Sequence, residues 1–154
     1  YELKFKATGL MGNISIAWLT GALFLLGGSV VGSIDRTVAI GAMAFLATLG
    51  REIVKDIQDM EPDFDRRTLP QSIGRRMSGA VASMAFIAAV LLSLQPVIAG
   101  IFGVGYLITI LFADGIFIYC SIVLFKDPRR GQIGAKIGMI AALIAFLIGG
   151  ANIV

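Results

Sequence analysis

Long apolar runs without a charged side chain dominate the pattern along the chain. The longest, Met77–Ala113, has 37 residues, whereas a helix of about 20 residues crosses the hydrocarbon core of a bilayer. This run must therefore turn, and Pro96 marks the turn together with the glycines after it, because proline and glycine interrupt helices. Ala7–Ile34 and Ile137–Val154 are further uncharged runs. The pattern predicts an all-α, polytopic transmembrane bundle, with its longest non-helical connection at about 61–74. The five expected helices cover about 9–33, 37–60, 76–98, 103–125 and 133–152.

The composition supports a membrane protein. Hydrophobic residues make up 57% of the chain and charged residues 15%, fewer charges than the usual quarter in soluble domains. A single cysteine and the absence of histidine exclude a disulfide framework, haem ligation by histidine and the common zinc and iron–sulfur sites. Any metal would be bound by oxygen ligands. The chain begins at Tyr1 without a signal-peptide pattern, and we expect it to be part of a longer membrane protein.

The basic residues predict how the helices are oriented. With five crossings, 12 of the 13 Lys and Arg residues fall on the side of the N-terminus, and Arg36 alone falls on the other. Positive residues favour the cytoplasmic side. We therefore expect a multi-pass protein of the cell membrane, with the N-terminus of this chain in the cytoplasm and its C-terminus outside. The net charge of +3 then reflects topology, and we expect no nucleic-acid partner.

The end of the second predicted helix is strongly acidic. Glu52, Asp56, Asp59 and Asp63 follow an i, i+4, i+7, i+11 spacing, which places them on one stripe of a helix. Stacked carboxylates repel one another, and the helix dipole disfavours negative charge at a C-terminus. A divalent cation offsets both costs, and Mg²⁺ typically bridges carboxylates and substrate phosphates. The alternative is a solvated, amphipathic helix end.

These residues carry a resemblance to a known family. The run Arg51–Glu61, followed by Asp63 and by Arg67–Pro70, resembles the second aspartate-rich motif of the UbiA superfamily of intramembrane prenyltransferases. The match is closest to the archaeal ether-lipid branch. Pro62 departs from the pattern, which has glycine there, and a further Asp65 follows.

The resemblance extends over the whole chain but covers only the later part of the family's proteins. The first residues, Tyr1–Lys6, and the Gly12–Asn13 pair are similar to the stretch that leads into the family's fifth helix. The five predicted helices then correspond to helices five to nine of a nine-helix fold. The family's first aspartate-rich motif belongs to an earlier helix, so we expect this chain alone to be inactive.

The resemblance implies a Mg²⁺-dependent prenyltransferase. In the archaeal branch a geranylgeranyl group passes from geranylgeranyl diphosphate to geranylgeranylglyceryl phosphate during ether-lipid biosynthesis. The implied partners are a polyprenyl diphosphate, a lipid acceptor, membrane lipid and the N-terminal helices of the same protein. The implied catalytic residues and metal ligands are Asp56, Asp59 and Asp63, and the candidate contacts to diphosphate or to the acceptor phosphate are Lys4, Lys6, Lys55 and Arg67.

Two polar residues and several aromatic ones fall inside the predicted membrane helices. Asn13 and Asp114 are candidate intramembrane polar contacts, because such residues usually face a bundle interior. Asp114 would either contact the acceptor or shuttle a proton, or it would act as structural glue with Ser121. A set of aromatic residues would either line a prenyl tunnel or pack against lipid: Phe102, Tyr106, Phe112, Phe117 and Tyr119.

Three other functions compete with this interpretation. A UbiA-type enzyme for an aromatic acceptor, in a quinone or chlorophyll-type pathway, would share the acidic motif, because that motif binds the diphosphate. A transporter or channel subunit would need carboxylates at the membrane midplane, where only Asp114 is expected. A CDP-alcohol phosphatidyltransferase is excluded, because Asp114–Gly115 is not followed by that family's Ala-Arg pair.

Overall fold

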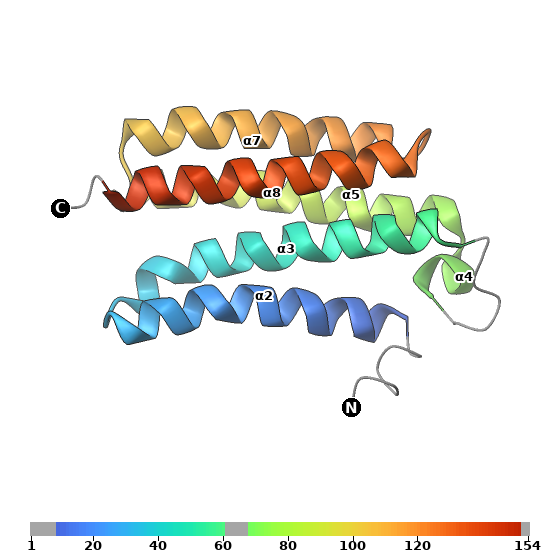
Figure 1. Cartoon of the computed structure of the whole chain (residues 1–154), viewed down its shortest axis with the longest axis horizontal. Coiled ribbons are helices and arrows are strands. Elements are labelled where there is room, and N and C mark those ends of the chain that lie inside the picture. Colours follow the sequence, from blue (N-terminus) through green and yellow to red (C-terminus); the bar gives the residue numbers. More distant parts are fainter. Residues whose placement is uncertain (1–8, 61–67, 152–154) are drawn as a thin grey trace.

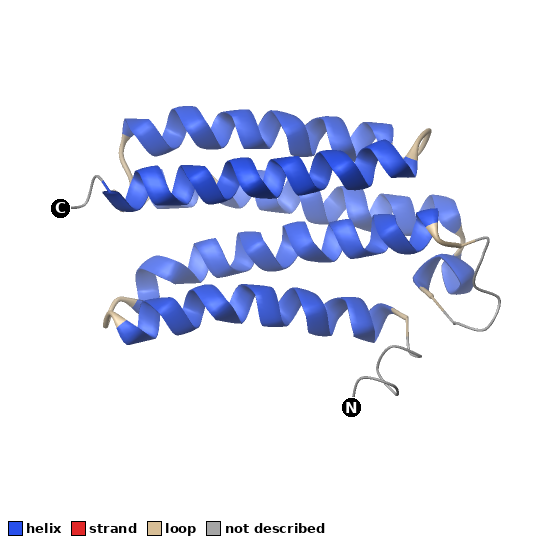
Figure 2. Cartoon of the chain, in the orientation of Figure 1, coloured by secondary structure: helices blue, strands red, loops and turns tan. Residues whose placement is uncertain are grey.

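The computed structural model describes residues 9–60 and 68–151, and all regular structure within them is helical (Figures 1 and 2). This confirms the predicted all-α transmembrane bundle. The helices are α2 (Leu10–Val30), α3 (Ile34–Gln58), α4 (Leu69–Ile73), α5 (Arg75–Leu92), α6 (Gln95–Ile98), α7 (Val104–Val123) and α8 (Pro128–Ala151).

Five of the helical segments are long and apolar enough to cross a membrane, counting α5 and α6 as one span. They run up and down (Figure 1), with α3 packed against α2, α5 and α8, and α7 packed against α5 and α8. Large apolar side chains such as Leu23, Ile108 and Leu147 are about two-thirds exposed. A bundle with such a surface is suited to lipid, where helices satisfy their own backbone hydrogen bonds.

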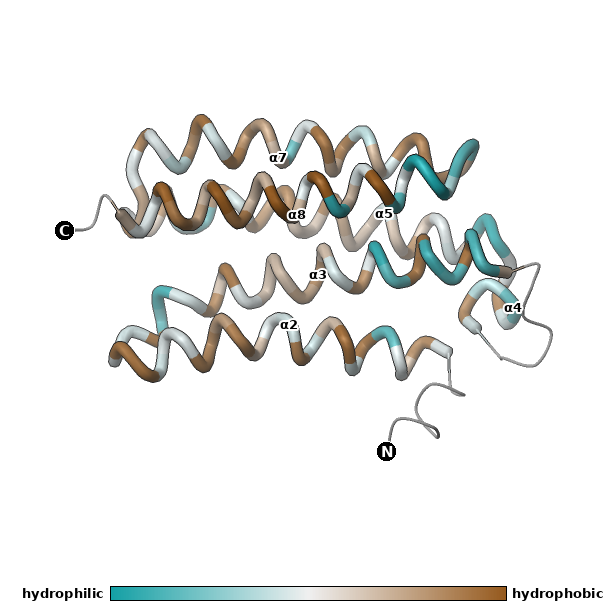
Figure 3. The backbone as a smooth tube through the Cα atoms, viewed as in Figure 1, coloured by the Kyte–Doolittle hydropathy of each residue, from teal (hydrophilic) through white to brown (hydrophobic). Residues whose placement is uncertain are grey.

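Polar residues gather at one end of the bundle. There α3 ends, α5 begins and α7 passes to α8, and α4 lies beside them (Figures 1 and 3). The first described turn of α2 lies at the same end (Figure 1). The alternation of helix directions thus brings together the connections that the sequence places on one side of the membrane.

The last helix begins earlier than the sequence predicts. α8 starts at Pro128, whereas the prediction places its start near residue 133. The Asp127 carboxylate accepts a hydrogen bond of 3.1 Å from the backbone N–H of Arg130, which is a typical helix cap. Proline is also favourable in the first helical turn. Capping by Asp127 therefore extends the helix into the basic connection.

The third predicted helix, 76–98, is interrupted. α5 ends at Leu92, and the four-residue α6 follows after Ser93 and Leu94. Pro96 explains the break, because a proline ring clashes with the carbonyl four residues earlier, here that of Leu92.

The connection predicted to be non-helical at 61–74 contains a short helix. α4 covers Leu69–Ile73 and has Pro70 in its first turn. The backbone N–H of Thr68 donates a 2.9 Å hydrogen bond to the Gln71 side chain. This local bond explains a single helical turn in a segment that lacks a long apolar run.

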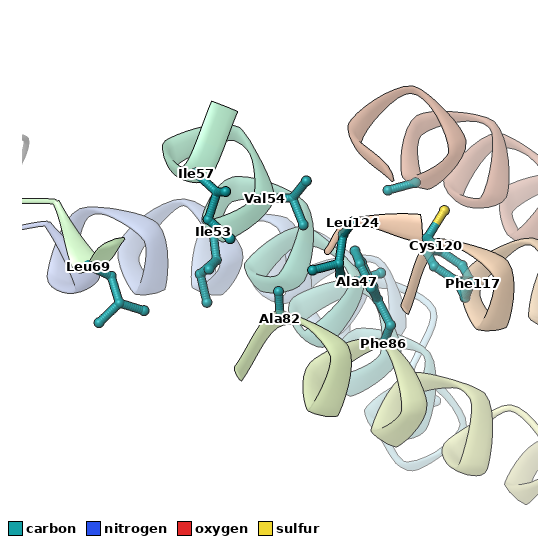
Figure 4. Packing of buried hydrophobic residues seen from close by; sticks show 11 residues of the cluster. Ala47, Ile53, Val54, Ile57, Leu69, Ala82, Phe86, Phe117, Cys120 and Leu124 are labelled. Atoms are coloured by element: carbon teal, nitrogen blue, oxygen red, sulfur yellow. The ribbon is translucent and has the colours of Figure 1, made fainter. Parts of the chain in front are cut away.

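A tightly packed core lies near the polar end and fixes the last turns of α3. Side chains of α3, α5 and α7 meet there (Figure 4), and the Phe86 and Phe117 rings lie 5.5 Å apart. Gly50 makes room for Phe86, since a Cβ at this position would come within 2.7 Å of the ring. Close approach at small residues is a common way to pack helices in membranes. The core therefore positions the acidic end of α3.

Candidate functional site

The acidic residues occupy three different settings at the end of α3. The helix ends at Gln58, and Asp59 is its C-cap. Glu52 is buried, Asp56 is half-buried and Asp59 is exposed. Asp63 lies outside the described residues. The structure therefore brings Asp56 and Asp59 to the same helix end, and Asp59 lies at the surface.

Glu52 belongs to an ion-pair cluster. One carboxylate oxygen lies 2.5 Å from the Arg51 guanidinium and the other lies 3.9 Å from the Lys55 ammonium. These cations on the same helix offset the negative charge of a carboxylate that is only 6% exposed. Glu52 thus has a structural role in this arrangement, and Lys55 is exposed beside it.

Asp56 is held by a residue from the beginning of α2. The Asn13 side-chain amide donates a 2.7 Å hydrogen bond to one Asp56 carboxylate oxygen. Asn13 is buried, so this bond crosses between two helices at the edge of the core. It orients the carboxylate, in the way that outer hydrogen bonds orient metal ligands. Asn13 is predicted from the sequence as a polar contact, but without a partner.

A groove of about 620 Å³ lies beside the acidic helix end, and its walls include the exposed Arg75 and Arg129. From the sequence, Arg129 contributes only to the prediction of topology, whereas Arg75 is also one of the cations near the acidic motif that are suited to phosphate charge. Here both arginines lie next to the last turn of α3, where they add positive charge suited to phosphate groups. The predicted phosphate contacts Lys4, Lys6 and Arg67 lie outside the described residues.

A separate cavity of about 270 Å³ lies inside the bundle, between all five long helices. Its walls are almost entirely apolar, and three polar side chains reach them: Thr20, Ser93 and Asp114. α3 contributes both to this cavity, through Ala47, and to the acidic end, through Asp56. The same helix therefore contributes to the acidic end of the bundle and to the wall of an apolar cavity.

Asp114 is bound to a different serine from the one expected. The Ser93 hydroxyl donates a 2.7 Å hydrogen bond to its carboxylate, and the Tyr106 hydroxyl donates a 2.8 Å bond to the Ser93 carbonyl. Ser121 instead donates to the Phe117 carbonyl of its own helix. The predicted partner was therefore wrong. These hydrogen bonds connect α7 to the turn after α5. They support a structural role for Asp114 over a contact to the acceptor or a proton shuttle.

The five aromatic candidates separate into three groups. Phe117 lines the cavity, and Phe102 and Tyr106 are buried at its outer end. Phe112 and Tyr119 are 68% and 52% exposed on the surface of α7, which fits the alternative that they pack against lipid. Two further cavity-lining phenylalanines, Phe24 and Phe146, were not predicted from the sequence.

Comparison with known proteins identifies the family. The sequence matches the UbiA prenyltransferase family over residues 1–149. The chain belongs to this family. Digeranylgeranylglyceryl phosphate synthase of Natronomonas pharaonis is 40% identical over 157 residues, with 97% of this chain and 55% of the relative covered. The enzyme of that name from Methanococcus maripaludis is 37% identical over 156 residues, with 97% of this chain and 56% of the relative covered.

A solved structure supports the same assignment. It is described as giving insights into the biosynthesis of digeranylgeranylglyceryl phosphate synthase in membranes. It is 38% identical and superposes with a TM-score of 0.83, covering 90% of this chain and 52% of the other. The chain thus spans about half the length of the relatives it matches. As a UbiA family member with five membrane-length helices, it is part of a multi-pass membrane protein.

The carboxylates at the end of α3 fit the Mg²⁺ that the UbiA family uses. Mg²⁺ prefers hard oxygen ligands, and it is commonly bound by one or two carboxylates together with substrate phosphates. Asp56 and Asp59 provide such oxygens, close to Arg75 in the neighbouring groove. Within residues 9–60 and 68–151, no cluster of three metal-binding side chains occurs. Two carboxylates at one helix end fit a metal whose remaining ligands come from substrate phosphates.

Replacing Ser93 by alanine should destabilise the UbiA bundle by about 1–3 kcal/mol, because the buried Asp114 carboxylate loses its hydroxyl partner. Thermal unfolding of the full-length protein in detergent measures this change. Ser29→Ala is the matched control, because that exposed hydroxyl bonds only within α2. Equal melting temperatures for the two variants would contradict the structural role of the Ser93–Asp114 pair.

Proposed function

We propose that the protein containing this chain transfers a geranylgeranyl group from geranylgeranyl diphosphate to geranylgeranylglyceryl phosphate in archaeal ether-lipid biosynthesis. The observation that carries the proposal is that α3 bears the carboxylates Asp56 and Asp59 at its polar end and also lines an apolar cavity inside the membrane bundle. A prenyl diphosphate has the matching chemistry, a charged head and a long apolar tail. The names of the relatives support the choice of acceptor.

The diphosphate head binds at the polar end of the bundle in this proposal. Asp56, Asp59 and Asp63 hold Mg²⁺, with Asp56 oriented by Asn13. A bound Mg²⁺ would neutralise the diphosphate and make it a better leaving group. The cations that contact the diphosphate or the acceptor phosphate are Lys4, Lys6, Lys55 and Arg67, with Arg75 and Arg129 from the groove.

The prenyl tail lies in the apolar cavity, which holds the reacting carbon away from bulk water. The bond between that carbon and the diphosphate oxygen breaks, and a bond to the acceptor's hydroxyl oxygen forms while the hydroxyl proton passes to the released diphosphate. Exclusion of water protects the reactive allylic group from hydrolysis. The ring of Phe117 lies in the cavity wall, and an aromatic face stabilises developing positive charge.

The polar end of the bundle faces the cytoplasm in this proposal. It carries Arg75, Arg76, Arg129 and Arg130, and an excess of basic residues favours that side. The acidic motif would then meet soluble Mg²⁺ and the diphosphate from the cytoplasm. The C-terminus after α8 would lie outside.

A direct assay tests the proposed reaction. The full-length protein is incubated in membranes with Mg²⁺, geranylgeranyl diphosphate and either geranylgeranylglyceryl phosphate or 4-hydroxybenzoate. We expect diphosphate release and a doubly prenylated lipid only with the first acceptor. Transfer to the aromatic acid alone would move the protein to the aromatic-acceptor class. The enzymatic proposal would be contradicted if no diphosphate were released with either acceptor while a thermal unfolding transition showed that the protein was folded.

A further inference from the structure

Two hollows with basic walls lie between the beginnings of two long helices. α5 begins at Arg75 and α8 at Pro128, and the groove of about 620 Å³ at the end of α3 has Arg75, Pro128 and Arg129 in its walls. A second hollow of about 300 Å³ shares Arg75 with this groove and adds Arg76 and Phe125. The two hollows thus meet at Arg75 and form one basic groove at the polar end of the bundle (Figure 3).

Both helices begin with basic residues where helices ordinarily carry acidic ones. The N-terminus of a helix is its positive end, so a cation in the first turn is unfavourable. The first turn of α5 nevertheless contains Arg75 and Arg76, that of α8 contains Arg129 and Arg130, and neither contains an acidic residue. The N-cap of α5 is Gly74, which provides no side-chain cap. An anion between the two helix beginnings would offset these costs, because first-turn N–H groups and guanidinium groups both bind anions.

The basic groove has little negative charge of its own. Asp127 supplies a carboxylate to its wall, but that carboxylate is already bound within α8. One oxygen lies 3.2 Å from the Arg130 guanidinium, and the other accepts a hydrogen bond from the Arg130 backbone N–H. Among residues 9–60 and 68–151, no carboxylate forms an ion pair with Arg75, Arg76 or Arg129. Three exposed guanidinium groups therefore remain for a ligand.

The basic groove and the Asp56 carboxylate face different neighbours of α3. Asp56 accepts its hydrogen bond from Asn13 of α2. The walls of the groove come from α3, α5, α8 and the connection between α7 and α8, and no described residue of α2 lines it. Asp56 and Asp59 are not among its wall residues either. A phosphate in the groove would thus bind apart from a metal held by these carboxylates.

Apolar side chains next to the arginines suit a lipid better than a soluble anion. Phe125 lines the basic groove and is 47% exposed, and Met77, directly after Arg76, is 60% exposed. The spans that contain α5, α7 and α8 all reach this end of the bundle, so the arginines lie where the hydrocarbon core gives way to headgroups. Basic pockets between membrane helices at this level bind lipid headgroups, and arginine can bind a phosphate through two parallel hydrogen bonds.

We propose that the basic groove binds the phosphate of a membrane lipid through Arg75, Arg76 and Arg129. This assignment separates Arg75 and Arg129 from the donor diphosphate, which the proposed function places at Asp56 and Asp59. Lipid binding requires no reaction, so the inference does not depend on the proposed activity. A lipid phosphate has two sources here, the acceptor geranylgeranylglyceryl phosphate and a phospholipid of the bilayer, and the experiment distinguishes them.

The test measures ligand binding to the full-length protein in detergent by native mass spectrometry. Arg75→Gln/Arg129→Gln is compared with Lys126→Gln/Lys136→Gln, which removes the same charge from exposed lysines outside the groove. The ligands are geranylgeranylglyceryl phosphate, phosphatidylglycerol, uncharged diacylglycerol, and an unreactive geranylgeranyl thiolodiphosphate with Mg²⁺. The arginine variant should bind at least one of the two phosphate lipids about tenfold more weakly, the scale of one lost charge-assisted hydrogen bond. Its binding of the other two ligands should match the wild type, and the lysine variant should bind all four like the wild type.

The lipid whose binding weakens identifies the source of the phosphate. A loss for geranylgeranylglyceryl phosphate identifies the acceptor, and the KM for the acceptor should then rise while the KM for the donor stays unchanged. A loss for phosphatidylglycerol identifies a bilayer phospholipid. Equal binding of both lipids by the arginine and lysine variants, or an equally large loss for the thiolodiphosphate, would overturn the inference.

The binding comparison also remains informative if other parts of the interpretation fail. A wild type without turnover contradicts the proposed function and leaves the comparison of lipid binding intact. Thermal unfolding shows whether each variant is folded. If the double arginine variant does not fold, Arg129→Gln decides by the same comparison, with Lys126→Gln as its control.

Discussion

Replacing Asp56 or Asp59 by alanine should lower Mg²⁺-dependent turnover of the full-length protein at least about 100-fold. The basis is that metal neutralisation of a diphosphate contributes several kcal/mol to the transition state. Asp56 has one oxygen fixed by Asn13, and Asp59 is exposed just beyond the last turn of α3. Prenyl transfer measured across a range of Mg²⁺ concentrations tests this expectation.

The control for these variants is a carboxylate on the same helix. Asp35 lies exposed in the first turn of α3, at the opposite end of the bundle, so Asp35→Ala should keep nearly full activity. Thermal stabilisation by Mg²⁺ together with an unreactive donor gives a second measurement, which should be lost in Asp56→Ala and Asp59→Ala only. Activity retained by both variants at low Mg²⁺ would assign the metal to other residues.

The number and order of the long helices follow directly from the sequence, because uncharged runs of this length have few other stable arrangements. Their ends do not. The early start of α8 depends on one side-chain cap by Asp127, and the end of α5 depends on where Pro96 removes a hydrogen bond. Such local features shift a helix end by several residues without changing the average hydropathy. The end of α3 is nearer its expected place, at Gln58 instead of residue 60.

The candidate site likewise has features that the sequence predicts and features that it does not. The acidic motif is visible in the sequence, because carboxylates at helical spacing are rare near a membrane. Its partners are not visible, since Asn13 is 43 positions from Asp56 and Ser93 is 21 positions from Asp114. The inner and outer faces of α7 also look alike in sequence. Both are apolar, so nothing in the pattern separates the buried Tyr106 from the exposed Phe112.

A leucine at Gly21 should strongly destabilise the bundle, while a leucine at Gly27 should not. α2 and α3 approach so closely that a Cβ at Gly21 would lie 2.7 Å from the Gly41 carbonyl oxygen and 3.3 Å from the Phe45 Cβ. The carbonyl belongs to a helix backbone and cannot move aside without separating the two helices. Overpacking usually costs about 1–3 kcal/mol and occasionally more, and we expect the upper end of that range or beyond here.

Gly27 provides the control because it lies exposed on the same helix, and a Cβ added there would meet nothing within 4 Å beyond the neighbouring turns of α2 itself. Leucine there gains helix propensity of up to about 1 kcal/mol over glycine and faces outward. Thermal unfolding of both full-length variants in detergent measures the difference. Since α2 also supplies Asn13 to Asp56 and Phe24 to the cavity wall, Gly21→Leu should reduce turnover as well. A Gly21→Leu protein that melts with the wild type would show that close α2–α3 packing is not what holds these two parts of the site in place.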